Sequence, residues 1–151
     1  MTQPIPEGFR TLTPHITVKG AAKAIDFYVE AFGAKEMRRM EMGGTIVHAE
    51  LRIGDSPIML NDEFPEQGAT APPEGGCGVR LHLYVDDVDA WFERATKAGA
   101  HGIMPPDDMF WGDRYAIVAD PFGHSWAIAT QIEELTDEEC MARAAQAMPP
   151  A

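Results

Sequence analysis

The feature that most constrains the fold of this chain is an internal repeat. His15-Ile16-Thr17-Val18 leads through a helix-like stretch to Gly33, and His82-Leu83-Tyr84-Val85 leads through a second such stretch to Gly99. The two histidines are 67 residues apart and the two glycines 66 residues apart, so the copies keep their register. A period of this length is too long for a solenoid unit. The repeat therefore predicts a duplicated module, with histidines on equivalent strands that could face one another across a shared site.

Both copies predict the same order of elements, which is a strand, a helix and three strands. Apolar residues alternate along the strands and recur at helical spacing between them, and glycines stand where caps and turns are expected. The first copy predicts strands at 13–18, 35–42, 45–53 and 57–61 around a helix that ends at Gly33. The second predicts strands at 79–85, 101–104, 114–119 and 125–131 around a helix that ends at Gly99, with Pro105-Pro106 breaking the second of these strands.

The domain organisation follows from these two copies. We expect modules at residues 11–62 and 79–131, joined by a linker rich in Gly and Pro at 63–78, within one α+β structural domain. Two tandem βαβββ modules would form a concave, partly closed mixed sheet with the helices outside. Residues 132–151 predict a C-terminal helix and tail, because Thr136 and Glu139 fit a capping box and the helix should run to about Met148.

Composition excludes several classes of protein. The net charge of −12 over 151 residues disfavours a nucleic-acid partner, because phosphate binding depends on clustered Lys and Arg. No stretch approaches the ~20 apolar residues of a membrane span. The N-terminus lacks a secretory leader pattern and Cys77 and Cys140 form no CxxC pair, so a cytoplasmic location is expected. The acidic surface is either ordinary solvated charge or an attraction for a cationic ligand.

Strand alternation predicts which side chains share a face. The long strand 45–53 should present one set of side chains on each face of the sheet. The first set is Val47, Ala49, Leu51 and Ile53, and the second is Ile46, His48, Glu50 and Arg52. If the helices cover one sheet face, polar groups from several strands converge on the other, with Arg114 as the rough counterpart of His48. These side chains form a candidate ligand pocket or metal site: His15, Thr17, His48, Glu50, His82, Tyr84 and Arg114.

Each of these residues also has a purely structural interpretation. A lone strand histidine more often makes a hydrogen bond than binds a metal, and His48 and Glu50 could be a solvent-facing pair in an open sheet. Trp111 lies in the apolar loop 109–112. Such a loop is either the rim of a binding site or part of the packing.

Several motifs together resemble the vicinal oxygen chelate superfamily, which includes glyoxalase I, bleomycin-resistance proteins, extradiol dioxygenases and fosfomycin-resistance enzymes. They are the tandem modules, the paired strand histidines and Asp120-Pro121-x-Gly123 before the last strand, and the resemblance spans residues 11–130. Other motifs look more narrowly like its PhnB-like branch: Thr13-Pro14-His15, Ala24-Ile25-Asp26-Phe27-Tyr28, His48-Ala49-Glu50-Leu51, Trp111-Gly112-Asp113-Arg114 and Ala119-Asp120-Pro121-Phe122-Gly123-His124.

The resemblance implies metal ligands on the first and last strands of both modules. His15 and His82 match the first-strand positions. The last-strand positions carry Ala127 and either Ile58 or Met59, none of which suits a hard or borderline divalent ion. A site of His15, His82 and Glu50 with an open water position stays conceivable.

Two main functions follow from the resemblance. One is an enzyme, namely a divalent-metal-dependent lyase, isomerase or transferase for a small oxygenated substrate, with Glu50 or His48 moving a proton. The other is a metal-free protein of the resistance or sequestration type that holds an aromatic or cationic compound, with Trp111 in its pocket. A sensor or partner subunit is a third possibility. We favour a small-molecule-binding protein that is not a true glyoxalase I, and the resemblance implies a homodimer.

Overall fold

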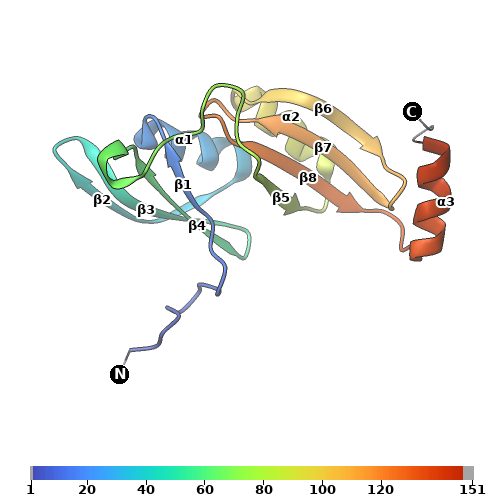
Figure 1. Cartoon of the computed structure of the whole chain (residues 1–151), viewed down its shortest axis with the longest axis horizontal. Coiled ribbons are helices and arrows are strands. Elements are labelled where there is room, and N and C mark those ends of the chain that lie inside the picture. The colour runs from blue at the N-terminus through green and yellow to red at the C-terminus, as the bar shows by residue number, and fades with distance from the viewer. Residues whose placement is uncertain (1, 148–151) are drawn as a thin grey trace. The chain divides into compact units, whose positions relative to one another are not determined.

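The computed structural model describes residues 2–147 and divides the chain into two compact units (Figure 1). One unit contains the chain up to Cys77 together with the short turn Pro121–Gly123, and the other contains Gly78–Asp120 and the chain from His124 onward. Each unit holds one βαβββ module with its own four-stranded mixed sheet, which confirms the predicted fold class.

The first module forms a sheet with the strand order β1-β4-β3-β2. β1 runs parallel to β4, and the other neighbours are antiparallel. Its elements are β1 (His15–Val18), α1 (Ala21–Phe32), β2 (Lys35–Met42), β3 (Thr45–Ile53) and β4 (Ser56–Asp62), and a short 3₁₀ turn, η1 (Pro65–Gln67), follows in the linker.

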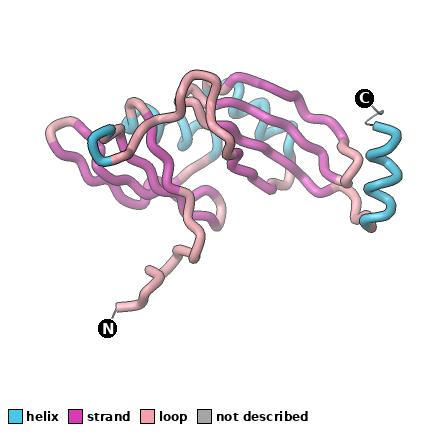
Figure 2. Tube along the Cα trace, in the orientation of Figure 1, coloured by secondary structure: helices cyan, strands magenta, loops and turns pink. Residues whose placement is uncertain are grey.

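The second module repeats this topology with the order β5-β8-β7-β6 and a parallel β5/β8 pair. Figure 2 shows the strands of the chain in magenta and its helices in cyan. Its elements are β5 (Arg80–Tyr84), α2 (Val88–Ala98), β6 (His101–Asp108), β7 (Asp113–Ala119) and β8 (Ser125–Gln131). The sequence therefore predicted every strand and both crossover helices, with three strands matching to the residue.

The two crossover helices begin in different ways. α2 has an N-cap in Asp87, whose carboxylate accepts from the Ala90 N–H at 3.1 Å. α1 has Gly20 at that position, which carries no side chain. Instead Asp62, at the end of β4, accepts from the N–H groups of Gly20 and Ala21 and from that of Ile46 on β3. One carboxylate thus ties the start of α1 to the sheet.

Each helix covers one face of its own sheet. Ile16 and Val18 are buried beneath α1, whereas His15 is exposed on the opposite face. In β5 the leucines are half-buried and the intervening His82 and Tyr84 are exposed. The predicted alternation of the two first strands is therefore confirmed, and the histidine of each module lies on the face that its helix leaves open.

The predicted alternation along β3 is wrong near the start of the strand. Ile46 is fully buried and Val47 is only half-buried, opposite to the expectation. Met40 pairs with His48 but Glu41 pairs with Ile46, so Val47 is an extra residue in a β-bulge. The bulge returns Ile46 to the helix-covered face and leaves His48 and Glu50 on the open one.

The predicted break at Pro105-Pro106 is also wrong. β6 continues through both prolines to Asp108, with a shift of register between Met104 and Asp107. β6 is an edge strand, and a proline there needs no partner for the missing N–H. The strand therefore extends the edge of the sheet by four residues beyond the expected end.

The C-terminal helix α3 (Asp137–Ala147) begins with the predicted capping box. The Glu139 N–H donates to Thr136 Oγ1 at 3.1 Å, and Glu139 Oε1 accepts from the Thr136 N–H at 3.3 Å. The predicted end at Met148 lies outside the described residues. The contacts that attach α3 include the Arg143–Glu133 ion pair and the hydrogen bond from the Cys140 thiol to the Trp111 carbonyl. Across residues 2–147, no helix is long and apolar enough to cross a membrane.

Candidate functional site

The strand register assigns the equivalent positions of the two modules. His15 pairs with Met59 on β4, and His82 pairs with Ala127 on β8. The last-strand positions beside the two histidines are therefore Met59 and Ala127. The sequence left Ile58 as an alternative, and Ile58 is instead buried on the helix-covered face.

A hydrogen-bonded network covers the open face of the first module. His15 Nε2 lies 2.6 Å from Asn61 Oδ1, while Asn61 Nδ2 donates to the Asp62 carbonyl at 2.7 Å and to Thr17 Oγ1 at 3.5 Å. Because the amide nitrogen of Asn61 faces a carbonyl, its oxygen faces His15 and accepts the bond. His15 Nε2 therefore carries a proton.

The second half of this network joins His48, Glu50 and Arg38. His48 Nε2 lies 2.8 Å from Glu50 Oε2, and Arg38 lies 3.9 Å from the same oxygen. A carboxylate only accepts, so His48 Nε2 also carries a proton. The side chains of His48 and Glu50 are 21% and 14% exposed, which makes this a partly buried pair rather than a solvent-facing one. The rings of His15 and His48 meet edge to face at 5.7 Å.

These contacts test whether the first module suits the metal that the resemblance implies. Metal ligation through Nε2 would require His15 or His48 to lose the proton that it donates to Asn61 or Glu50. Met59 offers only a thioether beside His15, which is a poor ligand for a hard divalent ion. Neither module holds, among residues 2–147, a cluster of three or more His, Cys, Asp or Glu side chains that could bind a metal ion. The donor set of each module therefore does not fit a metal centre by itself.

The open face of the second module is aromatic. Its rings contact one another in a chain, with distances measured between ring centroids. Trp111 lies 5.3 Å from Tyr115, Tyr115 lies 5.9 Å from His82, and His82 lies 4.6 Å from Tyr84. Asp113 Oδ2 joins the two ends of this chain, because it accepts hydrogen bonds from the Tyr84 hydroxyl at 3.1 Å and from Trp111 Nε1 at 2.9 Å. We call these five side chains the aromatic–carboxylate cluster.

Small residues form the floor of this cluster. Ala127 and Ala129 on β8 are fully buried, and Tyr115 packs against them. Larger apolar side chains surround this floor and are only partly buried: Met104, Met109, Trp111 and Ile117. Alanine occupies the two positions where the first module has Met59 and Asn61. The shorter side chains at the floor thus let Tyr115 and its apolar neighbours pack close to β8, where the first module has larger side chains.

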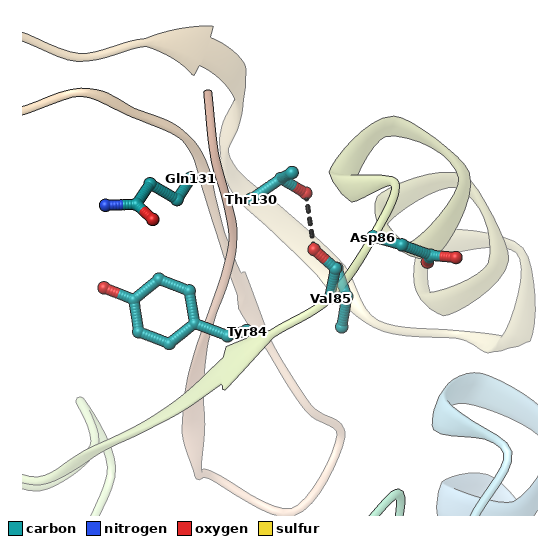
Figure 3. A pocket seen from close by; sticks show the side chains of 5 residues that line it. All are labelled: Tyr84, Val85, Asp86, Thr130 and Gln131. Atoms are coloured by element: carbon teal, nitrogen blue, oxygen red, sulfur yellow. Dashed lines mark hydrogen bonds between the residues drawn. The ribbon is translucent and has the colours of Figure 1, made fainter. Parts of the chain in front are cut away.

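A cavity of about 530 Å³ adjoins the cluster at Tyr84 (Figure 3). Tyr84 and Gln131 extend to the same side of it, and Gln131 pairs with Asp113 across β7 and β8. Partial burial of the hydroxyl, the hydrogen bond to Asp113 and the charge of that carboxylate raise the pKa of Tyr84. Tyr84 thus connects the cavity with the buried carboxylate.

Arg114 does not belong to this face, which corrects the prediction. Its guanidinium forms ion pairs with Asp89 on α2 and Asp108 on β6, on the helix-covered side of β7. The hydrogen bonds from Arg114 lower the pKa of Asp89. The residue equivalent to His48 is Tyr115, because β7 and β8 pair Tyr115 with Ala129.

Sequence reasoning missed four residues of the two faces, namely Arg38, Asn61, Asp113 and Tyr115. The repeat itself contained the information for Tyr115, because its 67-residue offset relates His48 to Tyr115. The same offset relates Asp113 to Ile46, which the bulge places on the opposite face. Of the predicted pocket residues, His15, Thr17, His48 and Glu50 do lie in one network. The remaining predicted members, His82, Tyr84 and Trp111, lie in the aromatic–carboxylate cluster. That the two histidines share one site stays a prediction.

Comparison with known proteins gives matches to sequence and to structure. A profile of the Glyoxalase/Bleomycin resistance protein/Dioxygenase superfamily matches residues 10–128. The uncharacterized protein Mb0911c of Mycobacterium bovis is 46% identical over 136 residues, which cover 87% of this chain and 90% of the relative.

Solved structures support the same fold. TioX from Micromonospora sp. ML1 matches with a TM-score of 0.67 at 28% identity, covering 82% of this chain and 99% of TioX. A gene product of Arabidopsis thaliana matches with a TM-score of 0.68 at 27% identity, covering 80% of this chain and 98% of that product.

Proposed function

The chain belongs to the glyoxalase/bleomycin resistance protein/dioxygenase superfamily, and we propose that it binds a small molecule without a metal, against the aromatic–carboxylate cluster. A fold of this kind hosts many activities, so the proposal depends on the side chains of the site. We also propose the PhnB-like branch, on the motifs around His48 and Trp111, and we propose that the chain is not a glyoxalase I.

The observation that carries the proposal is the alanine floor beneath aromatic walls. Ligand sites are mostly apolar recesses with a few polar groups that orient the ligand. Ala127 and Ala129 let Tyr115 pack close to the strand, the rings supply apolar area, and the Asp113 and Tyr84 oxygens supply polar contacts. The cavity of about 530 Å³ lies beside this cluster, at Tyr84. In the first module the polar groups hydrogen-bond to one another, and the cavity of about 290 Å³ beside them is lined by charged side chains that include Arg38, Glu50 and Arg52.

Filling the floor tests this proposal. We expect Ala127→Met, which installs the side chain found at the equivalent position of the first module, to abolish binding of compounds found in a thermal-shift screen. Ala22→Met is the matched control, because Ala22 is exposed on α1. Circular dichroism checks that both variants fold. If Ala127→Met binds every such compound as tightly as the unchanged protein, the site is elsewhere.

A second candidate function is proton transfer by His48 and Glu50. Glu50 holds the Nε2–H form of His48, which leaves Nδ1 as the basic nitrogen of the neutral ring. This pair needs no metal, unlike the enzyme that would use His15, His82 and Glu50. Turnover of a substrate that is lost in both His48→Gln and Glu50→Gln, but kept in His101→Gln on β6, would establish it. Glutathione-dependent turnover of methylglyoxal would contradict the proposal that the chain is not a glyoxalase I.

We further propose a homodimer in the cytoplasm. The eight residues of the edge strand β2 are all exposed, and Met37, Met40 and Met42 lie among them. Exposed edge strands with apolar side chains favour association. Light scattering at micromolar concentration tests this, and a monomer would contradict it.

A further inference from the structure

We propose that the ligand of the aromatic–carboxylate cluster is an organic cation, whose charged nitrogen lies against Asp113 and between the aromatic rings. This inference rests on the proposed binding site in the second module. It adds the charge and the chemical class of the ligand, which an apolar recess alone does not specify.

The first argument is the state of the Asp113 side chain. Asp113 is only 4% exposed, and both of its hydrogen-bond donors, the Tyr84 hydroxyl and Trp111 Nε1, reach the same oxygen, Oδ2. Oδ1 has no hydrogen-bond partner among residues 2–147. Every fully buried side-chain nitrogen or oxygen of the described residues does have one, so Oδ1 is not fully buried. The unused acceptor positions of this oxygen are the ones that a ligand would take.

The second argument is that Asp113 has no cationic partner among residues 2–147. The neighbouring Arg114 pairs with Asp89 and Asp108 on the other face of β7. Arg80 is the cation that reaches the open face, and it donates to the Tyr115 hydroxyl at 2.9 Å. Buried carboxylates are normally paired with a positive charge, because neutral donors replace only part of the lost hydration. A cationic ligand would supply the missing charge.

The third argument is the aromatic surround. Trp111, Tyr115 and Tyr84 present π systems around the carboxylate, and His82 lies between the two tyrosines. A cation over the face of Trp or Tyr is attracted by the ring, and most strongly when it is shielded from water. Rings together with one carboxylate thus select a large, weakly hydrated cation such as a quaternary or ring ammonium. A small metal ion would lack ligands here.

The surroundings also permit a cation to enter. The cavity of about 530 Å³ at Tyr84 has Asp86 and Gln131 in its lining, and no basic side chain lines it. The whole chain carries a net charge of −12, which raises the local concentration of cations. That long-range attraction is screened by salt, whereas a contact with a largely buried carboxylate is screened much less.

A pair of probes with similar size and the same ring system separates charge from shape. N-methylquinolinium carries a permanent positive charge, and 2-methylquinoline is neutral in mildly alkaline buffer. We expect calorimetry to show the cation binding at least about tenfold more tightly, at low and at high salt. Asp113→Asn keeps an oxygen that accepts from Tyr84 and Trp111, and it should remove the preference. Asp26→Asn, on the exposed side of α1, makes the same change of charge and should leave the preference for the cation unchanged.

The outcomes distinguish this inference from the proposed function. Equal binding of both probes, or a preference that persists in Asp113→Asn, overturns the cation while the binding site stands. Binding of neither probe overturns the inference, and with an empty ligand screen it overturns the proposed function as well. If Asp113→Asn fails to fold, Trp111→Leu replaces it. That variant removes a ring from a loop and should lower the preference, and an unchanged preference would contradict the inference.

Discussion

The two modules share one topology and present opposite chemistry on their open sheet faces. In the first, polar side chains use their hydrogen bonds on one another, so His15 binds Asn61 and His48 binds Glu50. In the second, rings surround a carboxylate that has no cationic partner among residues 2–147. The two faces differ at a few equivalent positions. Met59 corresponds to Ala127, Asn61 to Ala129, Thr17 to Tyr84 and His48 to Tyr115. Duplication has thus kept the backbone pairing while the faces diverged.

The largest expected effect concerns how each module holds its helix. Asp62 accepts three backbone N–H bonds, whereas its counterpart Thr130 accepts one from Val88 and donates one to the Val85 carbonyl. We expect Asp62→Ala to lower the free energy of unfolding by about 2–4 kcal/mol and Thr130→Ala by about 1 kcal/mol, because bonds to a charged group are stronger. Urea unfolding measures both. Equal losses would show that the two anchors are equivalent.

The next effect concerns the hydrogen bond between Tyr84 and Asp113, which has no counterpart on the open face of the first module described above. Because the pKa of Tyr84 is raised, the bond from its hydroxyl to Asp113 is present at neutral pH and is lost as the pH rises through that raised pKa. Ultraviolet difference spectra between the unchanged protein and Tyr84→Phe isolate this tyrosine from Tyr28 and Tyr115. In Asp113→Asn the titration of Tyr84 should move to lower pH. A titration that does not move would mean that Asp113 has no influence on it.

A smaller effect concerns the C-terminal helix α3, which follows the second module. The hydrogen bonds from Arg143 lower the pKa of Glu133, so this tether persists at neutral pH and weakens as the pH falls through the lowered value. We expect hydrogen exchange in α3 to accelerate in acid before that in α2. Glu133→Gln should show the faster exchange already at neutral pH. Identical exchange in Glu133→Gln and the unchanged protein would contradict this role.

The smallest expected effect is that of added divalent metal. Because Met59 and Ala127 flank the two histidines, we expect Mn²⁺, Ni²⁺ or Zn²⁺ to leave the melting temperature nearly unchanged. Metal analysis after dialysis checks this. One tightly bound ion per chain that is lost in His82→Ala would favour the metal-dependent enzyme instead, and would show that donors beyond one module take part.

Sequence alone predicted the backbone well and the open faces only in part. Glycine turns such as Gly43-Gly44 and the alternation in β1 and β5 mark strands by local geometry, and these predictions are confirmed. The bulge at Val47 was not predictable from alternation, because an extra residue reverses the faces without changing composition. Arg114 was placed one residue from the true counterpart, and in a strand one residue means the opposite face.

The alanine floor of the second module has a consequence for how ligand preference changes between related proteins. Ala127 and Ala129 take part in the sheet through backbone groups, which any residue except proline can supply. Replacing either buried methyl group with a larger side chain would displace Tyr115 and its neighbours without removing a backbone hydrogen bond of the sheet. If the proposed site is correct, single mutations at these two positions, which face the same way on β8, are expected to change its ligand preference.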